Sequence, residues 1–220
     1  MTTDTTVTIT TGRLAQALGS VVPFASRDVT LPSVCAVQLH CAEGVLTASA
    51  TNRYVIGHAR QPATGAFTRP RLLHWRDARA LRKALSRFMR DQGSSADLVA
   101  ITEADASLTV KFGYVTLSLD EPEGAKGAPD LGPILAKLPT NDTAGVQAPI
   151  GISRRVVKPV LKAARWAPCD PMRWLMAEPG KPFRVDIGDW FVAAVMPVSL
   201  RGDEKNVPIE LPQAAEAVTA

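Results

Sequence analysis

The stretch Ala50-Thr51-Asn52-Arg53-Tyr54-Val55-Ile56 predicts the end of one strand, a turn and the start of the next strand. Far along the chain stands a second stretch, Phe191-Val192-Ala193-Ala194-Val195-Met196-Pro197-Val198-Ser199-Leu200. It predicts a strand that ends near Pro197, because proline has no backbone N–H to offer a sheet. Taken singly, each stretch is ordinary, so their meaning depends on the pattern around them.

The chain repeats one order of elements three times: a strand, a helix and then three strands. The first repeat predicts a strand at 7–9, a helix from Thr11 or Gly12 to about Phe24, and strands at 34–40, 45–50 and 54–60. The second predicts a strand at 71–73, a helix at 76–90, and strands at 97–103, 107–112 and 115–119. The third predicts a strand at 148–152, a helix at 153–166, and strands at 172–178, 181–187 and 191–197.

This order predicts an α+β fold made of repeated β-α-β-β-β units, with the helices on one face of antiparallel sheets. One unit cannot bury the apolar side of its helix alone, so we expect units to pair side by side. A generic α+β protein with three helices fits the pattern equally well.

Composition suggests how the units are grouped. Residues 1–122 hold two units and are predicted to form one complete domain. Gly, Pro and Ala are frequent in 121–129, so we assign 123–145 to a linker whose apolar part, 130–139, should lie on a neighbouring surface. Residues 146–201 then hold the third unit by itself. Residues 202–220 are predicted to be a flexible tail, with Asp203, Glu204, Glu210 and Glu216 against Lys205.

Charge and cysteine content narrow the class of protein. The 220 residues carry a net charge of +4, and the tail contributes −3, which leaves +7 on residues 1–201. Such a balance permits nucleic-acid binding. No apolar run reaches the roughly 18–20 residues of a membrane helix. The N-terminus lacks a secretion signal, and three cysteines show no disulfide spacing. We therefore expect a cytoplasmic protein with no membrane partner.

Two of the predicted helices carry a row of positive charge. At about 100° per residue, the basic residues of the middle helix share an arc of about 80° and those of the third helix an arc of about 100°. The rows are Arg76, Arg79, Lys83, Arg87 and Arg90, and Arg154, Arg155, Lys158, Lys162 and Arg165. Like charges at this spacing repel, so a phosphate backbone is the ligand we expect. Solvated helix faces are the alternative interpretation.

Motifs of catalysis and of base recognition are missing from the sequence. His40 and Cys41 point to opposite sides of one predicted strand, and Cys35 lies close by, so these residues do not converge on a metal. There is no phosphate-binding loop of the GxxxxGK[ST] type. We expect no enzyme, no metal and no cofactor, and contacts to phosphates without sequence preference.

The two opening stretches and the repeated unit resemble bacterial or phage DNA sliding clamps, the β subunit of DNA polymerase III, in a shortened and divergent form. In that family, an Ala-Thr-Asp-Arg-type turn meets a terminal Met-Pro-x-Arg-Leu-type strand to form a peptide pocket, and helices line a ring around DNA. The resemblance implies that residues 1–122 are one complete domain of this kind and that 146–201 are a half-domain. Departures from the pattern are Asn52, Val55 and Ser199, a missing first domain and a missing half of the last domain.

The resemblance implies a processivity factor that encircles duplex DNA as a homo-oligomer and binds peptide motifs of a DNA polymerase and a clamp loader. Two other interpretations stay open: a clamp-derived adaptor or inhibitor that does not encircle DNA, and a plain non-specific DNA-binding protein. The small size suggests a phage or mobile element. The implied pocket residues are Thr51, Arg53, Tyr54, Ile56, Met196, Pro197, Val198 and Leu200, with Pro129 and Ile134 near the floor.

Overall fold

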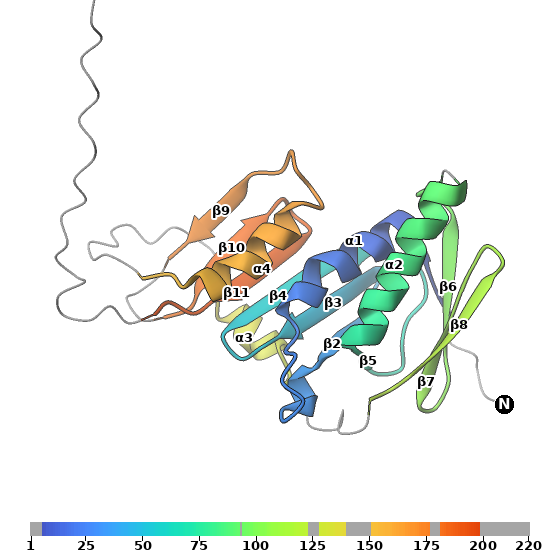
Figure 1. The fold of residues 1–220 in the computed structure, drawn as a ribbon, viewed down its shortest axis with the longest axis horizontal. Helices are drawn as coiled ribbons and strands as arrows, with labels where there is room; N and C mark the ends of the chain where they lie inside the picture. Colours follow the sequence, from blue (N-terminus) through green and yellow to red (C-terminus); the bar gives the residue numbers. More distant parts are fainter. Residues whose placement is uncertain (1–5, 93, 123–127, 140–150, 177–180, 199–220) are drawn as a thin grey trace, which may run out of the picture.

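Two antiparallel sheets organise the protein, shown as a ribbon in Figure 1. The computed structural model describes residues 6–92, 94–122, 128–139, 151–176 and 181–198. Its larger sheet has the strand order β5-β2-β3-β4-β11-β10-β9. These strands are β2 (Ala36–Ala42), β3 (Val45–Thr51), β4 (Val55–Pro62), β5 (Arg71–His74), β9 (Met172–Leu175), β10 (Phe183–Ile187) and β11 (Phe191–Val195).

The smaller sheet has the order β1-β6-β7-β8. It consists of β1 (Thr6–Thr10), β6 (Leu98–Glu103), β7 (Ser107–Phe112) and β8 (Val115–Asp120). Its first strand comes from the first predicted unit and the other three come from the second. The two units are therefore joined through a shared sheet, as their inability to bury a helix alone predicts.

The pairing of β4 with β11 brings together segments that lie far apart in the chain. Val55 is opposite Val195, and Phe191 is opposite Ala59 at the other end of the pair. This antiparallel ladder continues the sheet of the first unit into that of the third. The two stretches of the predicted peptide pocket thus end side by side.

Three long helices lie together on one face of the sheets: α1 (Thr11–Val21), α2 (Trp75–Gln92) and α4 (Arg154–Ala164). In Figure 1, α1 lies between α2 and α4. Each of α1 and α4 begins where a hydroxyl can accept an otherwise unpaired backbone N–H. Thr10 accepts from Arg13 N at 3.5 Å, and Ser153 accepts from Arg155 N at 3.2 Å. Shorter helices are η1 (Val22–Phe24), η2 (Pro32–Val34) and α3 (Gly132–Ala136).

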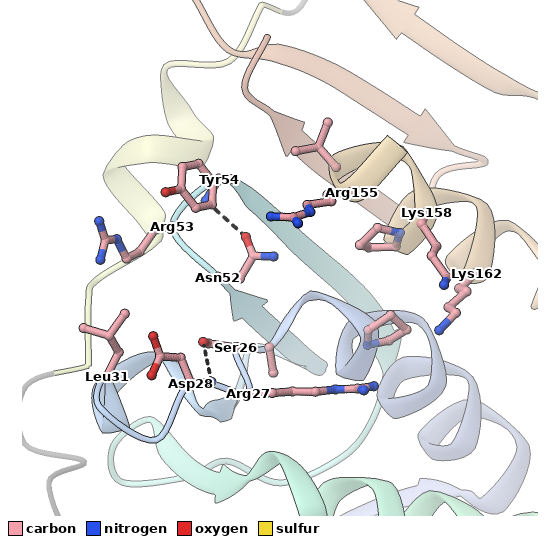
Figure 2. A pocket seen from close by; sticks show the side chains of 14 residues that line it. Ser26, Arg27, Asp28, Leu31, Asn52, Arg53, Tyr54, Arg155, Lys158 and Lys162 are labelled. Atoms are coloured by element: carbon pink, nitrogen blue, oxygen red, sulfur yellow. Dashed lines mark hydrogen bonds between the residues drawn. The ribbon is translucent and has the colours of Figure 1, made fainter. Parts of the chain in front are cut away.

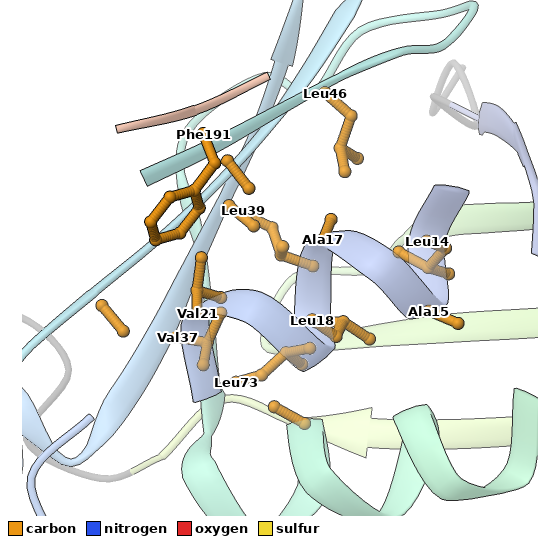
Figure 3. Close-up of a cluster of buried hydrophobic side chains, with 14 of the residues drawn as sticks. Leu14, Ala15, Ala17, Leu18, Val21, Val37, Leu39, Leu46, Leu73 and Phe191 are labelled. Atoms are coloured by element: carbon orange, nitrogen blue, oxygen red, sulfur yellow. The ribbon is translucent and has the colours of Figure 1, made fainter. Parts of the chain in front are cut away.

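The core forms where α1 packs on the larger sheet (Figure 3). Leu14, Leu18 and Val21 are fully buried on one side of α1, as the spacing of apolar residues predicts. They meet strand residues of all three units, and the labelled members are Val37, Leu39, Leu46, Leu73 and Phe191. Burial of this apolar surface is what fixes the three helices over the sheets.

Close approach of α4 to α1 depends on Gly19. A Cβ built on Gly19 would overlap Cζ2 and Cε2 of the Trp166 indole and lie 2.6 Å from its Nε1. The Gln16 side chain also donates to the Trp166 carbonyl oxygen at 3.3 Å. Glycine at position 19 therefore allows the end of α4 to pack directly on α1.

The predicted elements and the observed ones agree closely wherever the structure describes the chain. Most of the strand predicted at 148–152 lies outside the described residues; of that segment, Gly151 forms an isolated bridge with Val198. The predicted tail, 202–220, also lies outside them. The division into domains at 1–122 and 146–201 stays a prediction.

Candidate nucleic-acid and peptide interface

The basic rows of two helices meet across α1. Arg79 of α2, Lys162 of α4 and Arg165 directly after α4 line one hollow of about 520 Å³, together with Gly19 and Trp166. Burial lowers the pKa of the Lys162 ammonium, and the neighbouring cations Lys158, Arg27, Arg165 and Arg79 lower it further. The lining of this hollow is what places cations of separate elements on one shared surface.

Two cations of this hollow are not among the residues predicted from the sequence. Arg82 lies outside the predicted arc of α2, and Arg27 lies in the loop after η1, yet both line the hollow. A helical wheel gives the angle of Arg82 around its own helix but not the side on which a neighbouring helix lies. Knowledge of the α1–α2 packing would be needed to include it.

The remaining members of the predicted rows are less uniform. Arg76 lies over the Trp75 ring with its guanidinium carbon 5.6 Å from the ring centroid. Arg87 and Asp91 form an exposed ion pair at 3.5 Å, which partly neutralises that end of α2. Exposed cations that complete the rows are Lys83, Arg90, Arg154, Arg155 and Lys158. The positive surface is therefore strongest beside α1 and weaker at the end of α2.

The turn between β3 and β4 has a geometry set by its own side chains. Asn52 Oδ1 accepts the backbone N–H groups of Tyr54 and Val55, each at 3.1 Å. Arg53 has a φ of 79°, a left-handed conformation that costs energy for a residue with a Cβ. Met196 N donates to the Tyr54 carbonyl oxygen at 3.1 Å. The turn and the end of β11 are thus hydrogen bonded where the sequence predicts that they meet.

Helix α3 covers the outer side of this junction. Leu131 and Leu138 are buried against Ile56 and Ala194, and Leu135 packs at the edge of the same cluster. This confirms that the apolar part of the predicted linker lies on a neighbouring surface.

The predicted pocket residues divide by burial. Thr51 and Ile56 are buried, so they support the junction from below. Side chains open to solvent around the junction are Arg53, Tyr54, Pro129, Ile134, Met196 and Val198, and Pro197 is half-buried. Leu200 lies outside the described residues. The exposed apolar side chains on the segments that form the junction are Tyr54 (61% exposed), Ile134 (42%), Met196 (38%) and Val198 (43%).

A larger hollow, here called the basic cavity, lies between the loop at 25–31, the turn at 52–54 and helix α4 (Figure 2). It has a volume of about 790 Å³. Its charged lining residues are Arg27, Arg53, Arg155, Lys158, Lys162 and Asp28, and its apolar ones include Leu31, Tyr54, Val156 and Pro159. It thus combines residues of the predicted DNA-binding row of α4 with residues of the predicted peptide pocket.

The cations of the basic cavity have no carboxylate partner among the described residues. Within the described part of the chain, none of the five forms an ion pair. Asp28 is instead occupied by Thr30, whose hydroxyl and backbone N–H donate to Oδ1 at 2.6 and 3.0 Å and lower the pKa of the carboxyl group. In Figure 2, Arg27 extends towards Lys158 and Lys162, and Arg155 lies beside Asn52 and Tyr54. An anionic ligand suits this lining.

The described residues offer few side chains suited to metal binding. They contain no cluster of three or more His, Cys, Asp or Glu side chains that could hold a metal ion. None of the helices among them is long and apolar enough to cross a membrane. Cys35 and Cys41 are buried free thiols.

Solved structures of DNA sliding clamps are similar to this chain in fold. A DNA polymerase sliding clamp from Pseudomonas aeruginosa matches with a TM-score of 0.68 at 11% identity, over 89% of this chain and 67% of that one. A putative DNA polymerase III beta subunit from Eubacterium rectale gives 0.70 at 11%, over 89% and 66%. The C. crescentus beta sliding clamp, with PEG bound to its putative beta-motif tethering region, gives 0.65 at 14%, over 90% and 66%.

The chain therefore spans about two thirds of the length of these clamps. The predicted fold, a shortened clamp-like α+β architecture with antiparallel sheets, is confirmed. No protein-family model matches the sequence. No curated protein matches it either.

Proposed function

We propose that this protein is a non-enzymatic DNA polymerase processivity factor that assembles from copies of itself around duplex DNA. The observation that carries the proposal is the meeting of basic rows from α2 and α4 across α1, on one face of a clamp-like fold. In this proposal residues 1–122 act as one complete clamp domain and 146–201 as a half-domain joined by 123–145, in the cytoplasm of a bacterium or a phage-infected cell.

The helix face suits a nucleic acid that is bound without recognition of its base sequence. Its contacts would come from guanidinium and ammonium groups, which bind phosphate oxygens of any sequence. Two tryptophans lie beside the rows, but the guanidinium groups of Arg27 and Arg76 lie over the Trp75 ring and Trp166 packs against Gly19, so both rings are already engaged within the protein. Such contacts are strong at low salt, exchange readily and let a protein move along the duplex.

The junction of β4, β11 and α3 is the proposed docking site for peptides of a polymerase and a clamp loader. The exposed apolar side chains around Met196 would provide anchors, and buried Ile56 and Leu131 would keep the surface rigid. In the C. crescentus clamp named above, PEG occupies a region described as a putative beta-motif tethering region. That neighbour makes the equivalent surface the natural place to test here.

The decisive experiment compares retention on nicked circular DNA with retention on the same DNA made linear. A ring should stay on the circle and slide off free ends, and blocking the ends with a bulky protein should restore retention. Equal loss from both forms would contradict encirclement and favour an adaptor or a plain DNA-binding protein. Native mass should be a multiple of 23.5 kDa.

Variants test the surface itself. Replacing Arg79, Lys162 and Arg165 with Ala should weaken duplex binding and reduce the salt slope by roughly 0.9 for each phosphate that the protein no longer neutralises. The matched control is Lys111→Ala, an exposed lysine of β7 in the smaller sheet, and it should change neither quantity. An unchanged slope in the triple variant would refute a DNA-facing helix surface.

A further inference from the structure

The basic cavity lies between the two proposed sites, and its positively charged lining calls for an anionic ligand. Five cations and one occupied carboxylate leave it strongly positive. Lys158 and Lys162 belong to the row of α4, whereas Arg53 and Tyr54 belong to the turn at the peptide junction. Its lining also includes apolar groups, so it suits an extended segment that carries both carboxylates and aliphatic side chains.

A segment with this composition begins at the edge of the cavity. Met196 N donates to Tyr54 O at 3.1 Å, and Val198 N donates to Gly151 O at 3.0 Å, so the chain leaves the β11 end beside a residue that lines the cavity. The sequence that follows is acidic: 202–220 carries Asp203, Glu204, Glu210 and Glu216 against Lys205. Val207, Ile209 and Leu211 alternate around Glu210.

We propose that the acidic segment 203–216 binds in the basic cavity of its own chain and competes there with other polyanions for Lys158 and Lys162. Opposite charge, matching apolar content and a shared starting point carry the inference. Reach is no obstacle, because the five residues from Val198 to Asp203 span up to about 18 Å. A short tether gives such a segment an effective concentration on the order of millimolar, enough for a weak contact to be populated.

The bound segment would inhibit DNA binding by its own chain, an effect here called the brake. This consequence rests on the proposed function. A polyanion can use Lys158 and Lys162 only in molecules whose segment has left the cavity, so its apparent affinity falls by the fraction that is free. Because the competition is between charges, it should weaken as salt rises.

Zero-length cross-linking tests the contact without any DNA. A carbodiimide joins a carboxylate to a lysine amine only when the two touch, and mass spectrometry identifies the pairs in the unmodified full chain. We expect links from Glu204, Glu210 or Glu216 to Lys158 or Lys162, abolished in 0.5 M NaCl, and far fewer to the exposed Lys111 of β7. Equal numbers of links to Lys111, or none to α4, would overturn the proposal.

A mixture of unlabelled and ¹⁵N-labelled chains separates the possible occupants. Links confined to chains of one isotope support binding within a chain. Mixed pairs would overturn it in favour of the segment of a second copy. The Arg53→Ala and Arg155→Ala double variant should lower the yield of links to Lys158, since these cations line the same cavity.

Duplex binding then tests the brake. The full chain with Asp203→Asn, Glu204→Gln, Glu210→Gln and Glu216→Gln should bind a short duplex about 3–10-fold more tightly at low salt. Lys205→Gln, which makes the segment more acidic, should change affinity in the opposite direction. Cross-links without any duplex binding would refute the proposed function and leave the cavity contact standing. If the duplex affinity is the same in the quadruple variant, in Lys205→Gln and in the unmodified chain, the brake alone is refuted.

Discussion

Gly19→Ala is the most informative substitution, because the change in the free energy of unfolding can take either sign. In an ordinary helix this change stabilises, because alanine is better than glycine by about 1 kcal/mol. Here the new methyl group would occupy the space of the Trp166 ring, which rests on α1 at this point. The indole must swing away, and with it goes the packing that holds the end of α4 beside α1.

The magnitude follows from the surface that the indole would expose. A tryptophan buries about 150–250 Å² when fully covered, and about half of that at about 25 cal/mol per Å² corresponds to roughly 2–3 kcal/mol. Half is counted because Trp166 keeps part of its surface exposed and a displaced ring would uncover only part of the rest. Subtracting the helix gain of about 1 kcal/mol leaves a net destabilisation of about 1–2 kcal/mol.

The test is a double-mutant cycle in urea, followed by far-ultraviolet circular dichroism so that removal of a tryptophan does not change the signal. In the Trp166→Ala background the obstacle is absent, and Gly19→Ala should stabilise by about 1 kcal/mol. The same change would therefore have opposite signs in the two backgrounds. Stabilisation in both would show that α4 does not depend on this contact and would refute the reasoning.

Three further predictions concern stability. Gly57→Ala in β4 should cost about 1–3 kcal/mol in urea denaturation, because its Cβ would lie 2.6 Å from Cδ2 of the buried Phe24 ring; an equal destabilisation in a Phe24→Ala background would contradict this cause. Burial lowers the pKa of His58 to about 4, so unfolded chains bind the extra proton between pH 6.5 and 4 and stability should fall by about 2–3 kcal/mol over that window; His58→Asn should remove this part of the pH dependence. Arg71→Met should cost about 2–4 kcal/mol, because the carbonyl oxygens of Ala104 and Ser107 lose the Arg71 donor at 2.7 and 3.0 Å while Glu121 keeps Arg69, and a cost below 1 kcal/mol would show that these contacts contribute little.

The sequence predicted the elements well because their signals are local. Alternation in β2 and β3, the apolar stripe of α1 and the serine cap of α4 each depend on residues within one turn or one strand. The junction was a harder prediction, since nothing local relates Tyr54 to Met196. It could be predicted only because the two stretches together resemble a known pocket.

The candidate site was predicted less completely because it depends on packing between elements. Arg82 faces the hollow only because α1 lies on that side of α2, and Arg27 reaches it from a loop that carries no periodic signal. Charge rows on separate helices also give no information on whether they share a surface. The α4 side of that surface approaches α1 at Trp166 and Gly19, a packing detail with no sequence pattern of its own.

The position of the turn at 52–54 ties the two proposed sites together. Tyr54 accepts a backbone hydrogen bond from the end of β11 and also lines the basic cavity with Lys158. A peptide that covers Tyr54 would therefore bring its own charges within reach of the α4 cations, and an acidic peptide would compete with duplex DNA where a neutral one would not. Because that competition is electrostatic, it should vanish at high salt, whereas apolar anchoring at Met196 should persist. Measuring peptide and duplex affinities together, at low and at high salt, separates the two contributions at this one turn.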